Sequence, residues 1–407
     1  MKVEERFLDY ISVDTTSLDD TGTYPSTENQ WILARQLKEE MEHIGMEDVE
    51  LDSYGYVTGT IPANTDREVP VLGLISHMDT SDAVSGSDIK ANIFLYNGGD
   101  ILLNEEKSLW LRTEEYPELE TYIGQHLIVT DGTTLLGADD KAGIAEIMTF
   151  AESLINDPSI SHGRIRIAFT PDEEIGEGTK YFDVSKFGAD YAFTVDGGKI
   201  GEFVYENFNG AGAKITFHGK SMHPGSAKGH MVNAVLLAME FQDMLPHDER
   251  PMYTEGYEGF YHLYKIAGDV ECCTLEYIIR DHDRDLFEQR KREIKEIAHC
   301  MNEKYGSHTV EVSMQDSYYN MKEVILQHEK LIENALAAYR ECGIEPFIEP
   351  IRGGTDGARL SFKGLPCPNL STGGHNFHSV YEYIPVESME KMVDVLLKLA
   401  KKFAAEM

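Results

Sequence analysis

Short apolar runs in the first half of the chain lead into residues of the types that commonly bind metal ions. These residues are His77, Asp139, Glu174 and Asp196. Taken singly, an acidic residue after a strand is usually a turn former or a helix N-cap. Four such residues at the ends of candidate strands are harder to explain in this way, because ligands gather at the carboxyl ends of the strands in an open α/β sheet. The pattern therefore predicts a metal site.

The ligand types indicate which metal this site would take. Imidazole and carboxylate groups without thiolates suit a catalytic zinc ion better than a structural one. The zinc-protease helix motif H-E-x-x-H is absent, since His328-Glu329-Lys330-Leu331-Ile332 lacks the second histidine. The ligands must therefore be dispersed along the chain, which is common in two-metal sites. We expect two zinc ions per subunit, although cobalt and manganese can occupy such sites too.

The elements that must position these residues alternate along the chain. Residues 69–76, 164–170 and 191–195 are strand-like runs between loops rich in Gly and Asp. Residues 144–154 keep apolar side chains at helical spacing. The stretch 4–46 has the pattern of two helices joined by a polar loop. Strands that alternate with helices predict a layered α/β domain.

The order of the elements changes between about residues 208 and 313. The expected order there is strand, helix, strand, strand, helix, strand, at residues 213–218, 231–245, 261–270, 273–280, 284–305 and 308–313. This is the order of a ferredoxin-like α+β sandwich. The chain then returns to a helix at residues 323–342. The simplest architecture is a catalytic α/β domain of residues 1–207 and 314–407, with an inserted α+β lid domain of residues 208–313.

Several motifs resemble those of the di-zinc exopeptidases, the family that includes aminoacylase and carboxypeptidase G. The motifs around the expected metal site are His77-x-Asp79, Gly137-Ala138-Asp139-Asp140-Lys141-Ala142-Gly143, Thr170-Pro171-Asp172-Glu173-Glu174 and Asp196. Further similar stretches are Glu206-Asn207-Phe208-Asn209, His223-Pro224-Gly225, residues 255–262, residues 316–321 and residues 351–357. These stretches follow one another over nearly the whole chain, which makes the resemblance specific. It implies an α/β catalytic domain of the di-zinc exopeptidase type.

The resemblance also implies which residue holds which ion. Asp139 would bridge two zinc ions, His77 and Asp196 would complete one site, and Glu174 and His378 the other. His378 ends the stretch Gly373-Gly374-His375-Asn376-Phe377-His378, in which His375 is a rival that we rank second. The family further implies a cis peptide bond between Asp139 and Asp140.

The implied reaction is hydrolysis of a peptide bond. Two zinc ions, three carboxylates and one hydroxide sum to zero charge, and zinc lowers the pKa of its water toward ~7, which supplies a nucleophile at neutral pH. Glu173, beside a ligand, is the expected general base, which takes the water proton and passes it to the leaving amine. Asp79 would hydrogen-bond the ring N–H of His77 and fix its tautomer.

Three further residues lie on segments that the resemblance associates with substrate, namely His223, Arg280 and Arg352. An arginine at a fixed distance from the metals could clamp the C-terminal carboxylate of a peptide and so measure its length. His223 could instead donate to the oxyanion of the scissile carbonyl. Surface ion pairs are the common alternative for the two arginines. Closure of the inserted domain would bring His223 and Arg280 to the metals.

The resemblance to the family in the inserted domain and in residues 352–357 favours an aminopeptidase that releases the N-terminal residue from tripeptides. The same metal residues would serve a related dipeptidase, carboxypeptidase or N-acyl amino-acid deacylase. A non-catalytic peptide-binding protein is a weaker alternative, since it would need no general base at Glu173. Nucleotide binding is disfavoured, because neither G-x-x-x-x-G-K-[ST] nor a G-x-G-x-x-G after a strand is present.

Composition limits the partners and the location. The chain has 36 Lys and Arg against 71 Asp and Glu, a formal charge of −35, which disfavours nucleic acid and anionic membranes as partners. The five cysteines show no C-x-x-C spacing and are expected as free thiols. No apolar run approaches the ~20 residues of a membrane span. We expect an enzyme that is located in the cytoplasm and acts on small peptides with a free N-terminus. By analogy with related enzymes, we also expect a homodimer.

Overall fold

The computed structural model describes residues 1–405 and divides into two compact units. The first comprises Met1–Tyr205, Glu323–Glu349 and Thr355–Met407, and the second Glu206–Lys322 and Pro350–Gly354. The second unit is therefore an insertion in the first, with a short additional segment from later in the chain. Within residues 1–405, no helix is both long enough and apolar enough to cross a membrane.

The first unit is built on an eight-stranded sheet that carries the candidate metal ligands. Its strands, in spatial order, are β1 (Glu47–Leu51), β2 (Val57–Ile61), β8 (Ile165–Thr170), β3 (Leu72–His77), β9 (Tyr191–Gly197), β16 (Asn369–Ser371), β10 (Glu202–Val204) and β15 (Phe347–Ile348). Strands β8, β3, β9 and β16 run parallel. Every residue of β3 and β8 is buried, as expected for central parallel strands covered on both faces.

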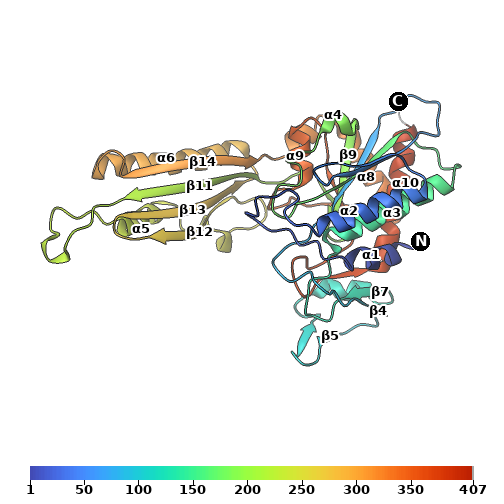
Figure 1. Ribbon diagram of the computed structural model, residues 1–407, viewed down its shortest axis with the longest axis horizontal. Coiled ribbons are helices and arrows are strands. Elements are labelled where there is room, and N and C mark those ends of the chain that lie inside the picture. Colours follow the sequence, from blue (N-terminus) through green and yellow to red (C-terminus); the bar gives the residue numbers. More distant parts are fainter. Residues whose placement is uncertain (406–407) are drawn as a thin grey trace. The chain divides into compact units, whose positions relative to one another are not determined.

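Helices cover both faces of this sheet. Helices α1 (Val3–Ile11), α2 (Gln30–Ile44) and α3 (Ala138–Asn156) lie on one side of β9 and helices α4 (Val184–Phe187) and α9 (Asp356–Phe362) on the other (Figure 1). Helix α3 approaches β9 closely at Gly143, where an added Cβ would lie only 1.9 Å from the carbonyl oxygen of Val195. Helix α10 (Val386–Ala405) packs against α3 and against α8 (Glu329–Glu341). The predicted layered α/β domain is confirmed.

Two small sheets, formed mostly by strands between β3 and α3 in the sequence, were not expected. One joins β17 (Tyr383–Pro385), β7 (His126–Val129) and β4 (Asn92–Leu95), and the other is the hairpin of β5 (Ile101–Asn104) and β6 (Leu109–Leu111). The 3₁₀ helix η1 (Pro117–Tyr122) supplies Leu119 and Tyr122 to a separate buried cluster with Leu127 and Tyr383. Strand β17 follows His378 in the sequence and pairs with β7, so the first of these sheets includes part of the segment after His378.

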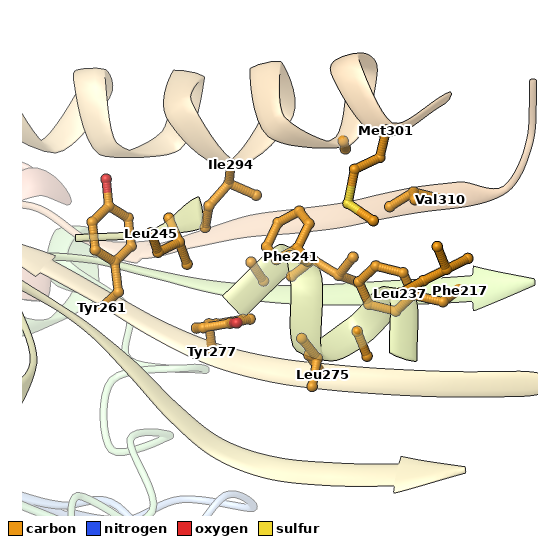
Figure 2. Packing of buried hydrophobic residues seen from close by; sticks show 14 of the residues in the cluster. Phe217, Leu237, Phe241, Leu245, Tyr261, Leu275, Tyr277, Ile294, Met301 and Val310 are labelled. Carbon is orange, nitrogen blue, oxygen red and sulfur yellow. The ribbon is translucent and has the colours of Figure 1, made fainter. Parts of the chain in front are cut away.

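The second unit has the predicted ferredoxin-like order. Its elements are β11 (Asn209–His218), α5 (Ala234–Met244), β12 (Phe260–Gly268), β13 (Cys272–Asp281), α6 (Arg284–Tyr305) and β14 (Val310–Tyr318). The strands form one antiparallel sheet in the order β12-β13-β11-β14. Figure 2 shows Phe241 of α5 between α6 and the sheet, in a core that includes Phe217, Tyr277 and Ile294. The inserted α+β fold is thus confirmed.

Two details differ from the sequence-based expectation. The helix expected over 323–342 is interrupted, because His328 has non-helical dihedral angles and separates α7 (Lys322–Ile325) from α8. The segment around Ile351 belongs with the second unit, because the N–H of Ile351 donates to Glu206 and its carbonyl accepts from Phe208. The predicted limits 208 and 313 lie inside the second unit.

Candidate metal centre

The ends of three neighbouring parallel strands meet at the candidate site. His77 is the last residue of β3 and pairs in register with Thr170, the last residue of β8. Asp196 lies near the end of β9, the neighbour of β3 on its other side. The Nε2 atom of His77 lies 3.4 Å from Oδ1 of Asp196. Glu173 and Glu174 follow β8 directly. The expectation that side chains gather at the carboxyl ends of these strands holds here.

Asp139 lies between two histidines from distant parts of the chain. Its Oδ1 atom is 3.0 Å from Nε2 of His77, and its Oδ2 atom is 3.0 Å from Nε2 of His378. Gly137 begins the turn with φ +79°, which a side chain would disfavour, and the peptide bond between Asp139 and Asp140 is cis, as the resemblance implies. Each carboxylate oxygen of Asp139 therefore faces a different imidazole, which is the geometry of a bridging ligand.

Two groups of possible metal ligands share Asp139. One is His77, Asp139 and Asp196, and the other is Asp139, Glu174 and His378. Within each group the candidate ligand atoms lie within 4.8 Å of one another. In the second group, Oε2 of Glu174 is 3.0 Å from Nε2 of His378. All five sequence-predicted ligands are therefore close together, although metal binding by them stays a prediction.

The donors fit divalent cations. The ion pairs of Asp139, Glu174 and Asp196 are all with the two histidines. Oε1 of Glu174 is buried and has no hydrogen-bond partner. Buried carboxylates that lack a partner are costly unless they are paired with a cation. Imidazole and carboxylate donors without thiolates suit zinc, cobalt or manganese.

The ionisation of these groups reflects the crowding of negative charge. Burial opposes protonation of His77, but Asp196, Asp139 and Asp79 raise its pKa well above the usual range. The hydrogen bonds of His378 to Asp139 and Glu174 raise its pKa to about 11. Burial raises the pKa of Asp196 to about 7. The site thus favours bound positive charge.

Asp79 connects His77 to the acidic pair that follows β8. Its carboxylate accepts hydrogen bonds from the backbone N–H groups of Glu173, at 2.9 Å, and Glu174, at 3.1 Å. The Nδ1 atom of His77 lies 3.0 Å from the carbonyl oxygen of Asp79 and 3.4 Å from its carboxylate. The expected partner of the His77 ring is thus the right residue, with the main-chain oxygen as the nearer atom. Asp79 therefore orients both sides of the site.

Burial and the neighbouring acid Asp356 both affect the pKa of Glu173. Burial raises the pKa of Glu173 well above its usual range, and the charge of Asp356 raises it further. Asp356 begins α9 and accepts a hydrogen bond from Oγ1 of Thr170 at 3.2 Å. A carboxyl group in such surroundings can hold a proton during a reaction cycle, as a general base must. The predicted role of Glu173 stays a prediction.

The three predicted substrate residues belong to the second unit. His223 is exposed, and its Nδ1 atom accepts a hydrogen bond from the N–H of Gly225 at 3.1 Å. The guanidinium of Arg280 lies over the ring of Tyr318 and donates to the carbonyl of Ile279 at 3.0 Å.

The guanidinium of Arg352 lies over the rings of Phe208 and Phe260, and it is hydrogen-bonded by a single loop. Its Nη1 atom donates to the carbonyls of Gly256 and Glu258, and its Nη2 atom donates to Thr254. Contact of these three residues with substrate stays a prediction.

Comparison with known proteins settles the family. Peptidase T of Caldanaerobacter subterraneus is 56% identical over 99% of this chain and 98% of its own length. Peptidase T of Clostridium novyi is 54% identical over 99% of both chains, and that of Halothermothrix orenii is 54% identical over the whole of both. The chain belongs to the peptidase T family. The model of the peptidase dimerisation domain matches residues 205–309, which lie almost entirely in the second unit.

Solved structures show the same fold as this member of the peptidase T family. Aminopeptidase PepT of Bacillus cereus has a TM-score of 0.79 at 24% identity and covers 99% of this chain and 98% of its own. A tripeptidase of Staphylococcus aureus has a TM-score of 0.78 at 23% identity, covering 100% and 98%. The YxeP protein of Bacillus subtilis, described as a dinuclear metal-binding peptidase of the M20 family, has a TM-score of 0.68 at 13% identity, covering 100% and 98%.

The structure brings further residues to the site that sequence reasoning missed. Asp140 accepts from the backbone N–H of His77 at 3.1 Å, and its place beside Asp139 was the available signal. Asp356 is buried near Glu173, within a stretch that sequence reasoning linked to substrate instead. Glu382 binds the Asp139 turn, and nothing local in the sequence marks it.

His375 is separate from both ligand groups. Its Nε2 atom lies 2.7 Å from the hydroxyl of Tyr122, and its ring stacks on Tyr383. Burial lowers the pKa of His375 to about 4. This histidine therefore fixes the loop that carries His378, which is consistent with its second rank as a ligand.

Proposed function

We propose that this peptidase T family member is a tripeptide aminopeptidase with two metal ions. The observation that carries the proposal is the pair of ligand groups sharing Asp139, in a chain with more than half of its residues identical to peptidase T over its full length. Zinc is the proposed metal, because the donors are imidazole and carboxylate groups. His77, Asp139 and Asp196 would hold one ion, and Asp139, Glu174 and His378 the other.

Different residues would have different roles in the hydrolysis. Bound divalent cations would supply Lewis-acid polarisation and lower the pKa of a water molecule. Glu173 would accept the proton of the attacking water and deliver it to the amine that leaves. Asp79 would keep Glu173 in place through the backbone N–H that it binds. Burial among other acids raises the pKa of Glu173, which makes its carboxylate a stronger proton acceptor once it is ionised.

Recognition of the scissile carbonyl and of the C-terminal carboxylate is proposed for residues of the second unit. His223, with an exposed imidazole, could donate to the oxyanion. Arg280 and Arg352 are the candidates for the clamp on the C-terminal carboxylate. Arg352 would take part only by releasing some of the loop oxygens that it now binds. The second unit would act as a lid that excludes water.

Assembly and location complete the proposal. The match of residues 205–309 to the peptidase dimerisation domain supports a homodimer formed through the second unit. We keep the cytoplasm as the proposed location. All five cysteines are free thiols, which is compatible with a reducing compartment.

A comparison of three substrates tests the activity. Initial rates are measured on Ala-Ala-Ala, N-acetyl-Ala-Ala-Ala and Ala-Ala, with the protein loaded with two equivalents of Zn²⁺. Fast release of the first residue of Ala-Ala-Ala alone is expected, because an aminopeptidase for tripeptides requires both a free amino end and a fixed length. A preference for the acetylated peptide would instead indicate a carboxypeptidase or a deacylase. Zinc binding without any hydrolysis would favour a peptide-binding protein.

A further inference from the structure

Glu382 is a buried carboxylate that binds the turn leading to Asp139. It is only 2% exposed. Its Oε2 atom accepts hydrogen bonds from the backbone N–H groups of Leu136, at 2.6 Å, and Gly137, at 3.0 Å. Its Oε1 atom accepts from Ala138, at 2.7 Å, and from Asp139, at 3.3 Å. Four consecutive N–H groups are therefore held by a single side chain from another part of the sequence.

This contact satisfies four N–H groups of the turn that leads into the regular part of α3, since Asp139 and Asp140 have non-helical dihedral angles. The first N–H groups of a helix lack intrahelical acceptors, and the helix dipole favours a negative charge near them. Gly137, the residue before α3, has no side chain that could cap the helix. A carboxylate offers about four acceptor positions, and Glu382 uses them on the turn. It is thus a remote anchor of the turn that begins α3, and its hydrogen bonds leave it poorly suited to be a metal ligand.

The position of Glu382 in the chain links the two sides of the second ligand group. Glu382 follows His378 by four residues, and it binds the backbone of Asp139, which lies 243 residues away in sequence. Asp139 and His378 are themselves 3.0 Å apart at their ligand atoms. The same carboxylate therefore sets the distance between the backbone of Asp139 and the loop that carries His378.

That loop is held in one conformation by its own hydrogen bonds. The backbone of His375 pairs with that of Tyr383 in both directions, at 2.9 and 3.1 Å. The amide of Asn376 donates to the carbonyl of Tyr381, and Oγ of Ser379 donates to the carbonyl of Asn376. A loop with this internal order transmits the position of Glu382 to His378.

The first ligand group has separate anchors. His77 and Asp196 lie on neighbouring strands of the main sheet. Asp140 accepts from the backbone N–H of His77 at 3.1 Å, which ties the Asp139 turn to β3 without Glu382. Loss of Glu382 would therefore disturb the distance between Asp139 and His378 more than that between Asp139 and His77.

We infer that Glu382 is a positioning residue for the second metal ion, the one held by Asp139, Glu174 and His378. It holds the Asp139 turn and the His378 loop at the spacing that this ion requires. The inference rests on the proposed two-metal site. Outer residues that orient ligands typically contribute a factor of about 10–100 to metal affinity.

Metal titration of Glu382 variants tests this inference. The metal-free protein is titrated with Zn²⁺ in competition with a chelator, as wild type, Glu382→Gln and Glu382→Asp. The amide of Gln would present donors to the N–H groups of the turn, whereas Asp keeps the charge. The matched control is Glu387→Gln, since Glu387 also accepts from a backbone N–H, that of His126, but lies on α10 outside both ligand groups.

The wild type and Glu387→Gln should bind two equivalents with the same constants. In Glu382→Gln the first equivalent should bind within about threefold of wild type and the second at least about tenfold more weakly, and millimolar Zn²⁺ should restore kcat. Should this variant not fold, Glu382→Asp is expected to show a smaller loss at the second equivalent alone. Unchanged binding of both equivalents, or equal weakening of both, would overturn the inference. Binding of only one equivalent by the wild type would refute the proposed two-metal function itself.

Discussion

At the scale of single residues, the site depends on side chains that orient one another. Asp79 binds the backbone of Glu173 and Glu174, while its own carbonyl binds the His77 ring. Glu173 is consequently fixed beside the candidate ligand Glu174 and belongs to neither ligand group. In the proposed mechanism, metal binding and proton transfer therefore belong to different residues, and the two can be measured separately.

Substitution of Glu173 by Gln should remove the proton carrier and leave the ligands intact. The expected result is a fall in kcat of about 10²–10⁴-fold, the usual contribution of a general base, with both metal equivalents still bound. Steady-state kinetics and metal titration on the same preparation check this. Glu177→Gln is the control, because Glu177 lies in the same loop in an exposed ion pair with Lys180. A Glu173→Gln variant with wild-type kcat would place the base elsewhere.

Four of the five candidate ligands could be predicted because each follows a recognisable local pattern, whereas His378 was expected only from the family resemblance, in a loop that also holds His375. His77, Glu174 and Asp196 come after apolar runs, and Asp139 lies in a Gly-rich turn before a helix. Glu382 could not be predicted in this way. Its partners are backbone N–H groups 243 to 246 residues away. The type of a residue does not indicate what its backbone N–H binds.

At the scale of elements, alternation and spacing predicted the central strands and α6 well. The predicted helix 284–305 is α6, Arg284–Tyr305. The elements between β3 and α3 were missed, because strands such as β6 (Leu109–Leu111) are too short to show a period. The break at His328 was missed because helical spacing continues on both sides of it.

The hydrogen bonds between Arg352 and the loop that it binds provide a test of the role of Arg352. Arg352→Lys keeps the charge but loses the planar set of donors that reach Thr254, Gly256 and Glu258. We expect a loss of about 1–2 kcal/mol in unfolding free energy, from the several hydrogen bonds removed, measured by denaturant unfolding. The ratio of kcat/KM for Ala-Ala-Ala and its C-terminal amide tests the clamp on the same variant. An unchanged ratio would contradict a clamp by Arg352.

Acid should weaken the contact between α6 and β14. Burial opposes the shift, but hydrogen bonds from Lys291 of α6 and from Tyr319 lower the pKa of Asp316 in β14. A carboxyl group whose pKa is lower in the folded state stabilises the fold above its unfolded pKa of about 3.9, and this stability is lost as the pH falls through the folded value. Asp316→Asn should therefore cost roughly 1 kcal/mol at pH 7, and much of this difference should vanish near pH 3. Denaturant unfolding of the metal-free proteins at both pH values measures it. An equal difference at pH 7 and pH 3 would show that the charge of Asp316 contributes nothing.

At the scale of the whole molecule, the candidate ligands all belong to one of the two units. The five residues lie within Met1–Tyr205 and Thr355–Met407. The second unit has a hydrophobic core of its own, between its sheet and helices α5 and α6. Metal removal should therefore change the stability of the two units to different extents.

Chelation should destabilise the first unit and leave the core of the second unchanged. A ligand that binds only the folded state adds about 2.7 kcal/mol of stability at one hundred times its Kd and about 4.1 kcal/mol at one thousand times. Hydrogen exchange resolved by peptide, with and without a chelator, measures where that stability resides. We expect faster exchange at the start of α3 and in the loop of His375 to Tyr383, and the same exchange as before in β11 and β13. The variant Asp196→Asn should respond less to the chelator, since it lacks one ligand. Equal acceleration in β11 and β13 would mean instead that the two units unfold together, so that metal binding in the first unit also stabilises the fold of the second.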